Sequence, residues 1–313
     1  MKVHMKLRLF LCLFVMLSGA LSGGIEKHFK SAPKKSGNHQ MKGIDFIYMI
    51  NLDQRPEKFA LSQAELAPYG IYPYRFSAVN GWELSKGTLN SAGVTYKPWM
   101  LNDLLGTAYL PENDGKATHE MMSVVGRNYY SHHMSRGAIG IVLSHLSILQ
   151  DAYNSGYNTI WVMEDDVQVV RNPHELTSLI KELDKVVGQK NWDILFTDPD
   201  TKRANGEYIP CTGHARKPNF TPKNTERFRA RKIINDKFVK TGARYGAYSM
   251  IVRRSGMKKL LNFVKTYGIF LPFDLEFYLP NDINLYTLRY DVVSTLPAAL
   301  SDNGAPRYNE IIK

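Results

Sequence analysis

The chain has 313 residues, of which 44% are hydrophobic, and it carries 40 lysines and arginines against 29 aspartates and glutamates. This composition excludes a disordered or fibrous protein, and the length suits one large α/β domain with embellishments. The net charge of +11 favours anionic partners. The sequence has no zinc-finger, helix-turn-helix or RNP-type pattern, so we expect no nucleic acid as a partner.

The first residues have the layout of a targeting segment. Three basic residues precede an apolar run over residues 9–17, and small residues follow it. We predict a signal peptide over residues 1–23, with a short membrane anchor as the alternative. The expected location is the secretory pathway or the cell envelope, and the cytoplasmic face of a membrane stays open. Residues 24–42 are rich in Lys, Ser, Gly and His and predict a flexible linker.

One large domain is predicted over residues 43–313, and it opens with a strand, a helix and a strand. Residues 44–50 form an apolar run suited to a buried parallel strand. Pro56 suits a first helical turn, so a helix is expected over residues 56–70, and residues 74–79 predict the second strand. Polar residues at both strand ends are typical of a doubly wound sheet that binds its ligand at the carboxyl edge.

Helices and strands continue to alternate through the middle of the domain. Residues 82–135 lack a clean period and predict an insertion or lid. A helix is expected over residues 137–156, strands over 159–163 and 192–197, and a further helix over 172–187. This alternation predicts an α/β sandwich in a single domain with insertions.

The last third begins with a strongly basic segment. Residues 201–232 contain nine Lys and Arg residues against two acids, and we predict a basic loop over residues 201–236. Its charge is expected to attract an anionic partner and to allow contact with a membrane surface. A strand over 247–252, a helix capped by Ser255 and a strand over 291–296 complete the predicted domain.

Three consecutive carboxylates, Glu164-Asp165-Asp166, follow the predicted strand over residues 159–163. They would repel one another unless a cation neutralises them, and oxygen ligands suit Mg²⁺ or Mn²⁺. A metal held by Glu164 and Asp166 could clamp a diphosphate. The alternative is a solvated acidic turn, but the position at a strand's carboxyl end favours function.

Further candidate binding residues follow the first two strands and begin the helix over residues 137–156. The two glycines of that helix permit close backbone approach, and a hydroxyl and an imidazole follow one turn later. The alternatives are ordinary turn chemistry and a packed histidine. The candidates are Asn51, Asp53, Ala78, Asn80, Gly81, Gly137, Ser144 and His145.

In this order and spacing, the segments resemble glycosyltransferase family 25, the group of lipooligosaccharide glycosyltransferases and procollagen galactosyltransferases. The resemblance runs from residue 44 to about residue 303. Lys58 departs from the family's usual Arg, and Ala138 from its usual acid. The resemblance is carried by Tyr48-Met49-Ile50-Asn51-Leu52-Asp53, Phe76-Ser77-Ala78-Val79-Asn80-Gly81, Ser144-His145, Glu164-Asp165-Asp166, Trp192-Asp193, the segment 254–260 and Pro272-Phe273-Asp274.

The resemblance implies a GT-A type, Rossmann-like fold that transfers a hexose, typically galactose, with inversion. The implied donor is a nucleotide diphosphate sugar such as a UDP-hexose. The implied acceptor is a glycan, a glycolipid or a protein-linked acceptor, and the basic loop favours an anionic one. Mn²⁺ or Mg²⁺ would be held by Glu164 and Asp166. Donor contacts are expected from Asn51, Asp53, Arg55, Ala78, Asn80, Gly81, Gly137, Ser144, His145 and Asp165.

An inverting transfer needs a base that removes the acceptor proton. Asp274, in the Pro-x-Asp element, is the first catalytic candidate and Asp302 is the second. A helix cap or a turn residue is the alternative role for Asp274, and a further metal ligand or a turn former is the alternative role for Asp302.

Two other functions stay open. The first is a secreted carbohydrate-binding or effector protein with the same fold and no turnover, which the signal-like start, Lys58 and Ala138 favour. The second is a metal-dependent phosphohydrolase. It ranks last, because its aspartyl nucleophile would stand where this chain has Glu164.

Overall fold

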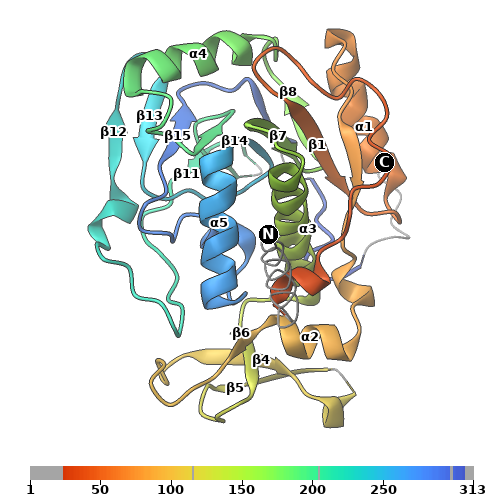
Figure 1. Ribbon diagram of the computed structural model, residues 1–313, viewed down its shortest axis with the longest axis vertical. Helices are drawn as coiled ribbons and strands as arrows, with labels where there is room; N and C mark the ends of the chain where they lie inside the picture. The colour runs from red at the N-terminus through yellow and green to blue at the C-terminus, as the bar shows by residue number, and fades with distance from the viewer. Residues whose placement is uncertain (1–23, 115, 204, 297–298, 307–313) are drawn as a thin grey trace, which may run out of the picture.

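The computed structural model describes residues 24–114, 116–203, 205–296 and 299–306, so the predicted targeting segment over 1–23 lies outside the described residues. Its central layer is an eight-stranded mixed sheet with the strand order β12-β13-β15-β9-β14-β7-β1-β2 (Figure 1). The strands are β1 Phe46–Asn51, β2 Tyr74–Ser77, β7 Thr159–Met163, β9 Ile194–Phe196, β12 Arg231–Ile233, β13 Phe238–Thr241, β14 Ser249–Arg253 and β15 Leu285–Leu288.

The sheet brings the ends of distant segments to one edge. Strands β2, β1 and β7 run parallel to one another, and β14 runs antiparallel between β7 and β9. The carboxyl ends of β2, β1, β7 and β9 therefore meet the amino end of β14. The antiparallel β14 makes the sheet mixed rather than the purely doubly wound sheet that the sequence predicts.

Helices cover both faces of this sheet. In β1, Phe46, Tyr48 and Ile50 pack into one apolar core, and Ile47 and Met49 pack into the other. Helices α3 (Arg136–Asn154) and α5 (Arg254–Tyr267) lie side by side over the first core, and α1 (Pro56–Leu66) and α4 (Glu175–Val187) cover the second (Figure 1). Burial of both faces explains why the strands are continuous apolar runs, and it confirms the α/β prediction.

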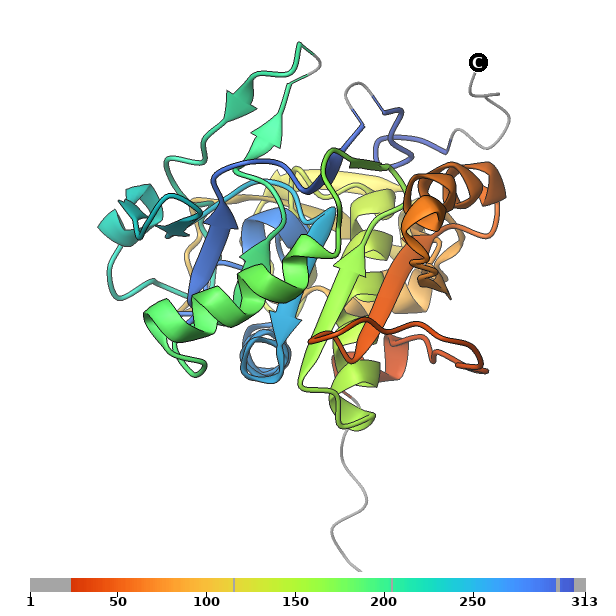
Figure 2. The same cartoon turned by 90° about the horizontal axis from the view of Figure 1, so that it is seen from above.

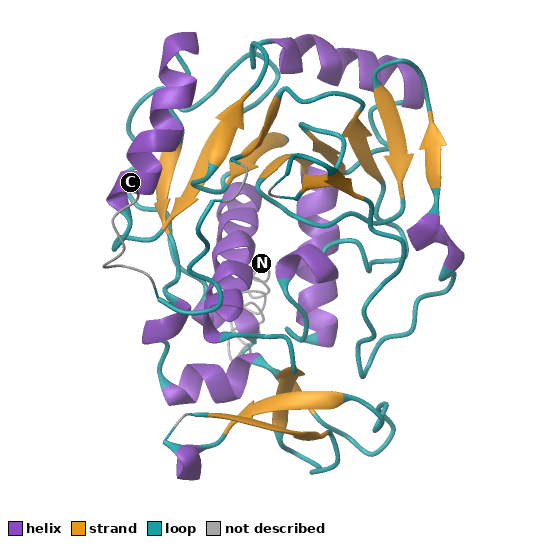
Figure 3. Cartoon of the chain, turned by 180° about the vertical axis from the view of Figure 1, so that it is seen from behind, coloured by secondary structure: helices purple, strands orange, loops and turns teal. Residues whose placement is uncertain are grey.

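Residues 82–135 form a small unit at one end of the molecule (Figure 3). It consists of α2 (Lys86–Ala92) and an antiparallel sheet in the order β3-β6-β4-β5. The unit is fastened to the main body by the Ser131 amide, which donates to the Phe270 carbonyl at 2.8 Å. Its strands are β3 Val94–Thr95, β4 Leu105–Tyr109, β5 Ala117–Met121 and β6 Asn128–Ser131, and the 3-10 turns Gly81–Glu83 (η3) and Pro111–Asn113 (η4) flank α2 and β4.

Short pairings complete the domain. Strand β16 (Val293–Thr295) pairs with β8 (Val167–Val169) outside the central sheet. The hairpin of β10 (Thr201–Lys202) and β11 (Tyr208–Ile209) projects from the body (Figure 2). The remaining elements are α6 Phe273–Glu276 and the 3-10 turns Ile25–His28, Ala67–Tyr69 and Glu226–Arg229.

The predicted cap of α5 is wrong. The helix begins after Arg253, and the Ser255 hydroxyl donates to the Asp193 carboxylate at 2.6 Å instead of capping the helix.

Across the described ranges, no helix is both long and apolar enough to cross a membrane.

Residues 24–42 lie against the domain. The Lys30 amide donates to Ser147 Oγ at 2.9 Å, and Tyr74 donates to the Pro33 carbonyl at 2.7 Å. Lys35 Nζ lies 2.5 Å from a carboxylate oxygen of Asp151 on α3. These contacts hold the segment that the sequence predicts to be a flexible linker on the surface of α3 and β2.

Candidate functional site

A pocket opens at the shared edge, over the carboxyl ends of β2, β1 and β7. It measures about 100 Å³ and borders a depression of about 280 Å³, and both are lined by residues 78–80. All predicted site residues except Asp53, Arg55 and Asp274 line the pocket. Its lining is Ile50, Asn51, Leu52, Lys58, Ala78, Val79, Asn80, Gly81, Trp82, Gly137, Ile141, Ser144, His145, Glu164, Asp165, Asp166, Ser301, Asp302 and Asn303.

The acidic triplet that follows β7 forms the electrostatic centre of the pocket. Burial raises the pKa of Glu164 well above its usual range, and the negative charges of Asp166 and Asp165 raise it further. Burial also raises the pKa of Asp165, to about 6, and that of Asp166. Glu164 keeps 30% of its side chain exposed, so protein surrounds it on all but the pocket side. Lys58 is the cation whose charge reaches all three.

His145 approaches the triplet from α3. Its Nε2 lies 3.3 Å from a carboxylate oxygen of Glu164, and its ring meets Phe273 edge-on at 4.1 Å between centroids. Burial lowers the pKa of His145 to about 3, so the ring is neutral near pH 7 and the contact is no ion pair there. Among the described residues, neither ring nitrogen has a hydrogen-bond partner. A neutral imidazole nitrogen beside a carboxylate is thus available to a ligand.

The C-terminal segment closes the pocket through Asp302. Nη1 of the fully buried Arg55 donates to both carboxylate oxygens of Asp302, at 2.7 and 2.9 Å. Lys58 Nζ lies 3.4 Å from the same carboxylate and donates to the Leu300 carbonyl at 2.6 Å. The Trp82 indole donates to the Asp302 carbonyl at 3.0 Å. Arg55 therefore lies behind the residues that line the pocket. Because two cations pair with the Asp302 carboxylate, Asp302 is a weaker candidate for the base.

Asn51 orients the triplet from the end of β1. Its Nδ2 donates to the Asp165 carboxylate at 2.6 Å and to the Arg55 carbonyl at 2.7 Å. Arg75 Nε donates to Asn51 Oδ1 at 2.7 Å, which fixes the amide plane. The polar residue at this strand end thus holds Asp165.

The glycines and Ser144 shape the pocket wall. A Cβ atom on Gly140 would lie 2.5 Å from the Val79 carbonyl oxygen, and one on Gly81 would lie 1.8 Å from the Arg136 carbonyl oxygen. Ser144 Oγ accepts from the Val79 amide at 2.8 Å. The start of α3 can pack this closely on the loop after β2 only because both positions are glycine.

Asp53 lies outside this pocket. Its carboxylate accepts from Ser77 Oγ at 2.6 Å, lies 3.0 Å from an Arg75 guanidinium nitrogen and is 55% exposed. It lines the neighbouring depression together with Lys30 and Glu83.

Asp274, on α6, acts on the triplet through its charge. The cap of this helix is Pro272, so the alternative role of Asp274 as a helix cap is wrong. Burial raises the pKa of Asp274, while the Gly246 amide, which donates to its carboxylate, lowers it. The charge of Asp274 also contributes to the raised pKa of Glu164, so the two carboxylates are electrostatic neighbours.

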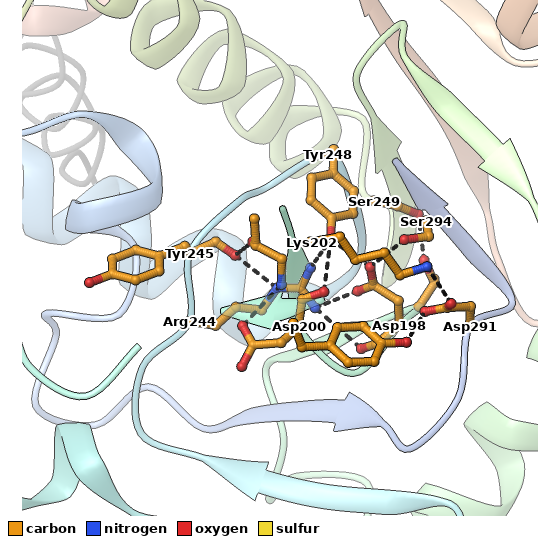
Figure 4. Close-up of polar contacts among 12 residues, drawn as sticks. Asp198, Asp200, Lys202, Arg244, Tyr245, Tyr248, Ser249, Asp291 and Ser294 are labelled. Atoms are coloured by element: carbon orange, nitrogen blue, oxygen red, sulfur yellow. Dashed lines mark hydrogen bonds and ion pairs between the residues drawn. The ribbon is translucent and has the colours of Figure 1, made fainter. Parts of the chain in front are cut away.

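A second polar cluster lies at the same edge, at the end of β9 (Figure 4). Asp198 and Arg244 are fully buried and pair at 2.5 Å. Tyr248 and Ser294 donate to the same carboxylate at 2.5 and 2.8 Å. No sequence pattern predicts this cluster, and its one signal is the pair of acids, Asp198 and Asp200, directly after the predicted strand over 192–197.

Internal contacts use much of the charge in the basic segment. Lys217 is fully buried and pairs with Glu276, and Arg227 donates to three backbone carbonyls at residues 278–280. Arg231 lies 2.9 Å from Asp200. Much of the segment's positive charge is therefore paired with acids and carbonyl groups of the protein itself. Of the exposed cations in the segment, Arg216 and Arg231 are held in ion pairs, and Arg203, Lys223, Arg229 and Lys232 face solvent.

The pocket offers a metal ion side-chain atoms without hydrogen-bond partners, but not a complete set of protein ligands. Among the described residues, no three His, Cys, Asp or Glu side chains are arranged to hold an ion. The buried Oδ1 of Asp166 nevertheless lacks a hydrogen-bond partner in the described part of the chain, as do both nitrogens of His145. Such a donor set fits a hard cation that brings further oxygen ligands with it, because Mg²⁺ sites often combine one or two carboxylates with substrate phosphates.

Comparison with known proteins assigns most of the chain to one family. Residues 44–276 match the model of glycosyltransferase family 25, described as LPS biosynthesis proteins. A glycosyltransferase 25 family member of Drosophila melanogaster is 25% identical over 189 residues, covering 60% of this chain and 26% of that protein. Mouse procollagen galactosyltransferase 2 is 26% identical over 155 residues, covering 49% and 20%.

Another relative bears on turnover. The mouse inactive glycosyltransferase 25 family member 3 is 26% identical over 169 residues, which cover 54% of this chain and 24% of that protein. The chain thus spans about a quarter or less of the length of these relatives.

Proposed function

Since this chain belongs to glycosyltransferase family 25, we propose that it transfers a hexose, galactose by preference, from a nucleotide diphosphate sugar to a glycan, glycolipid or protein-linked acceptor. The observation that carries the proposal is the pocket itself, where Glu164, Asp165 and Asp166 crowd together with raised pKa values and one cation, Lys58, within reach. Three charged carboxylates this close together are favourable with a bound cation and unfavourable without one.

Glu164 and Asp166 would hold Mn²⁺ or Mg²⁺ together with the donor diphosphate, and His145 lies beside them. When bound, the ion supplies positive charge against the departing nucleoside diphosphate. Asn51 keeps Asp165 in place, and the loop after β2 offers backbone groups to the nucleoside. The position and the combined size of the pocket and the adjoining depression support a UDP-hexose as the donor and a GT-A type arrangement of the site.

Asp274 is the base that we assign to the acceptor. Its raised pKa makes the carboxylate a stronger base than an exposed aspartate, and its charge acts on Glu164, next to the donor site. In the proposed step, Asp274 takes the proton of the acceptor hydroxyl while its oxygen bonds to the anomeric carbon from the face opposite the diphosphate, and the bond from that carbon to the diphosphate breaks, which gives inversion. Asp302 holds the C-terminal segment over the pocket instead.

An anionic acceptor and a location in the secretory pathway or cell envelope are further parts of the proposal. The exposed cations of the basic segment and the overall charge of +11 support an anionic acceptor. The alternative function, carbohydrate binding without turnover, is favoured by the relatives described as inactive.

A scan of nucleotide sugars tests the proposal. The full chain is incubated with each sugar, Mn²⁺ and a panel of glycolipid and protein-linked glycan acceptors, and release of the nucleoside diphosphate is measured. We expect acceptor-stimulated release that chelation of the metal abolishes. Glycan binding without release from any nucleotide sugar would instead establish the alternative.

A further inference from the structure

Segment 24–42, the stretch ahead of β1, takes part in the depression beside the acidic pocket. The depression of about 280 Å³ is lined by His28, Phe29 and Lys30 of this segment and by residues 53–54, 78–80 and 83–84 of the domain. Residues 78–80 also line the pocket that holds the acidic triplet, so the two spaces share a border. Because the family match covers residues 44–276, this wall of the depression comes from outside the matched domain.

Contacts with three helices hold the start of the segment in place. It begins beside α2, where His28 Nε2 and Ser91 Oγ form a hydrogen bond at 2.8 Å (Figure 1). Glu26 Oε1 lies 3.0 Å from Lys265 Nζ on α5, and the Lys30 amide donates to α3. The wall is therefore a fixed part of the surface around the depression.

Lys30 joins the ends of two strands. Its Nζ donates to Ser77 Oγ at 2.6 Å and to the Ala78 carbonyl at 3.2 Å, at the end of β2. The same Nζ lies 4.0 Å from the carboxylate of Asp53, just after β1. One ammonium group thus holds the loop after β2 against the loop after β1, and the loop after β2 forms the border between the depression and the pocket.

Gln54 adds a buried acceptor to the depression. Its Nε2 donates to the Glu83 carboxylate at 2.8 Å, and its Oε1 has no hydrogen-bond partner in the described part of the chain. A buried acceptor without a partner is unfavourable unless a bound molecule brings an N–H or O–H group to it. The ribose and the base of a nucleoside both carry such donors.

The size of the acidic pocket calls for a second space. The pocket measures about 100 Å³, whereas ligand sites commonly measure about 300–1,000 Å³. If the diphosphate lies at the carboxylates of the pocket, the nucleoside needs room beside them. The depression supplies that room, with apolar side chains from Phe29 and Leu84 and polar ones from Asp53 and Asn80.

We propose that segment 24–42 is part of the donor site, where it forms the outer wall of a nucleoside subsite and where Lys30 is the positioning residue for the loop after β2. The inference rests on the proposed function, in which Glu164 and Asp166 hold the metal and the diphosphate. It assigns Asp53, which lies outside the acidic pocket, to the nucleoside subsite.

Lys30→Met tests the inference, because it removes the ammonium group and keeps an apolar side chain of similar length. The full chain and its variants are titrated by calorimetry with UDP, GDP, ADP and CDP in turn and with inorganic pyrophosphate, each with Mn²⁺. We expect Lys30→Met to weaken binding of the preferred nucleoside diphosphate about tenfold, or ~1.4 kcal/mol, and to leave pyrophosphate binding unchanged. Pyrophosphate has both phosphates and no nucleoside, so damage to the metal site would weaken both ligands alike.

Two further variants sharpen the test. Lys35→Met is the matched control, since Lys35 belongs to the same segment and pairs with Asp151 but does not line the depression. It should bind both ligands as the wild type does. Lys30→Arg keeps the charge and should recover most of the lost affinity.

The outcomes separate the inference from the proposed function. A loss in Lys30→Met that is confined to the nucleoside diphosphate supports the inference, even if the chain transfers no sugar, in which case the proposed function alone fails. Unchanged nucleoside diphosphate affinity in Lys30→Met, in a wild type that binds the nucleotide, overturns the inference and leaves the proposed function standing. An equal loss for pyrophosphate, or an equal loss in Lys35→Met, also overturns the assignment of Lys30.

Discussion

Two groups of carboxylates follow the parallel strands β7 and β9, which flank β14, and their surroundings differ. After β7, Glu164 and its two neighbours crowd at the pocket, and burial together with mutual repulsion raises the pKa of Glu164. After β9, Asp198 is saturated by Arg244, Tyr248 and Ser294. In the sequence, both groups are acids directly after a predicted strand, and nothing there distinguishes them.

The difference shows that the position of acids at a strand end does not by itself mark a ligand site. What distinguishes the two is whether the protein supplies the counter-charge. The triplet is left to be neutralised by a ligand, whereas the β9 group is neutralised from within. Mutations in the two groups should therefore separate activity from stability.

The largest expected effect is the loss of activity in Asp166→Asn. Removing one metal-binding carboxylate should lower metal-dependent transfer by ~10³-fold, because the ion supplies several kcal/mol at the leaving group. The thermal midpoint of the metal-free protein should stay unchanged or rise, since a repulsive charge is removed. Full turnover in this variant would remove the triplet from the metal site.

The matched change in the other group is Asp198→Asn. It leaves the buried Arg244 without its counter-charge, so we expect the free energy of unfolding, measured by urea denaturation, to fall by about 3–5 kcal/mol. The loss should appear without added metal or donor. A variant as stable as the wild type would show that Asp198 does not depend on internal pairing.

Asp274→Asn should lower kcat by ~10²-fold and leave donor affinity nearly unchanged, as expected for loss of a general base. Asp302→Asn is the comparison, because it loosens the contacts with Arg55 and Lys58 that close the pocket and should weaken donor binding. If Asp302→Asn alone shows the kcat pattern, the two roles must be exchanged.

The pH dependence of stability should also differ between the groups. Because burial raises the pKa of Asp165 to about 6, the folded chain binds a proton more tightly than the unfolded chain between pH ~4 and 6. The free energy of unfolding therefore falls as pH rises through this window, and we expect a loss of about 1 kcal/mol from pH 5 to pH 7. Glu164 and Asp166 also have raised pKa values and add to this fall, so Asp165→Asn should reduce it by about 1 kcal/mol. An equal fall in both proteins would contradict the assignment.

The smallest expected effect concerns the exposed cations. Changing Arg203, Lys223 and Lys232 to Ser should raise the KM for an anionic acceptor about 2- to 5-fold at low salt, with the difference fading at high salt. Donor KM should stay the same. Changing the internally paired Lys217 and Arg231 should instead destabilise the fold. Equal acceptor kinetics at low and high salt in both proteins would leave the segment without a recruiting role.

The sequence predicts the buried parallel strands and long helices well, because their apolar runs and periods come from local patterns. Strand β7 (Thr159–Met163) agrees with its prediction residue for residue. Strand β15 and the antiparallel β13 escape prediction, since their pairing depends on segments far along the chain. The sheet over residues 82–135 also escapes prediction, as its strands have two to five residues and β5 is largely exposed.

The site shows the same division. Asn51, Ser144, His145 and the acidic triplet come together because the ends of parallel strands meet at one edge. Trp82 and the C-terminal closure by Asp302 could not be anticipated, because a chain end that folds back leaves no periodic signal. The pairing of Asp198 with Arg244 spans 46 residues and likewise has no local pattern.

Binding of Mn²⁺ in the presence of a nucleoside diphosphate tests the central claim most directly. Free Mn²⁺ is followed by its paramagnetic resonance signal while UDP, GDP, ADP and CDP are added in turn to the full chain, to Asp166→Asn and to Asp198→Asn. We predict that the wild type and folded Asp198→Asn sequester Mn²⁺ with one of these nucleotides and that Asp166→Asn does not. Sequestration by Asp166→Asn with undiminished affinity would contradict the account.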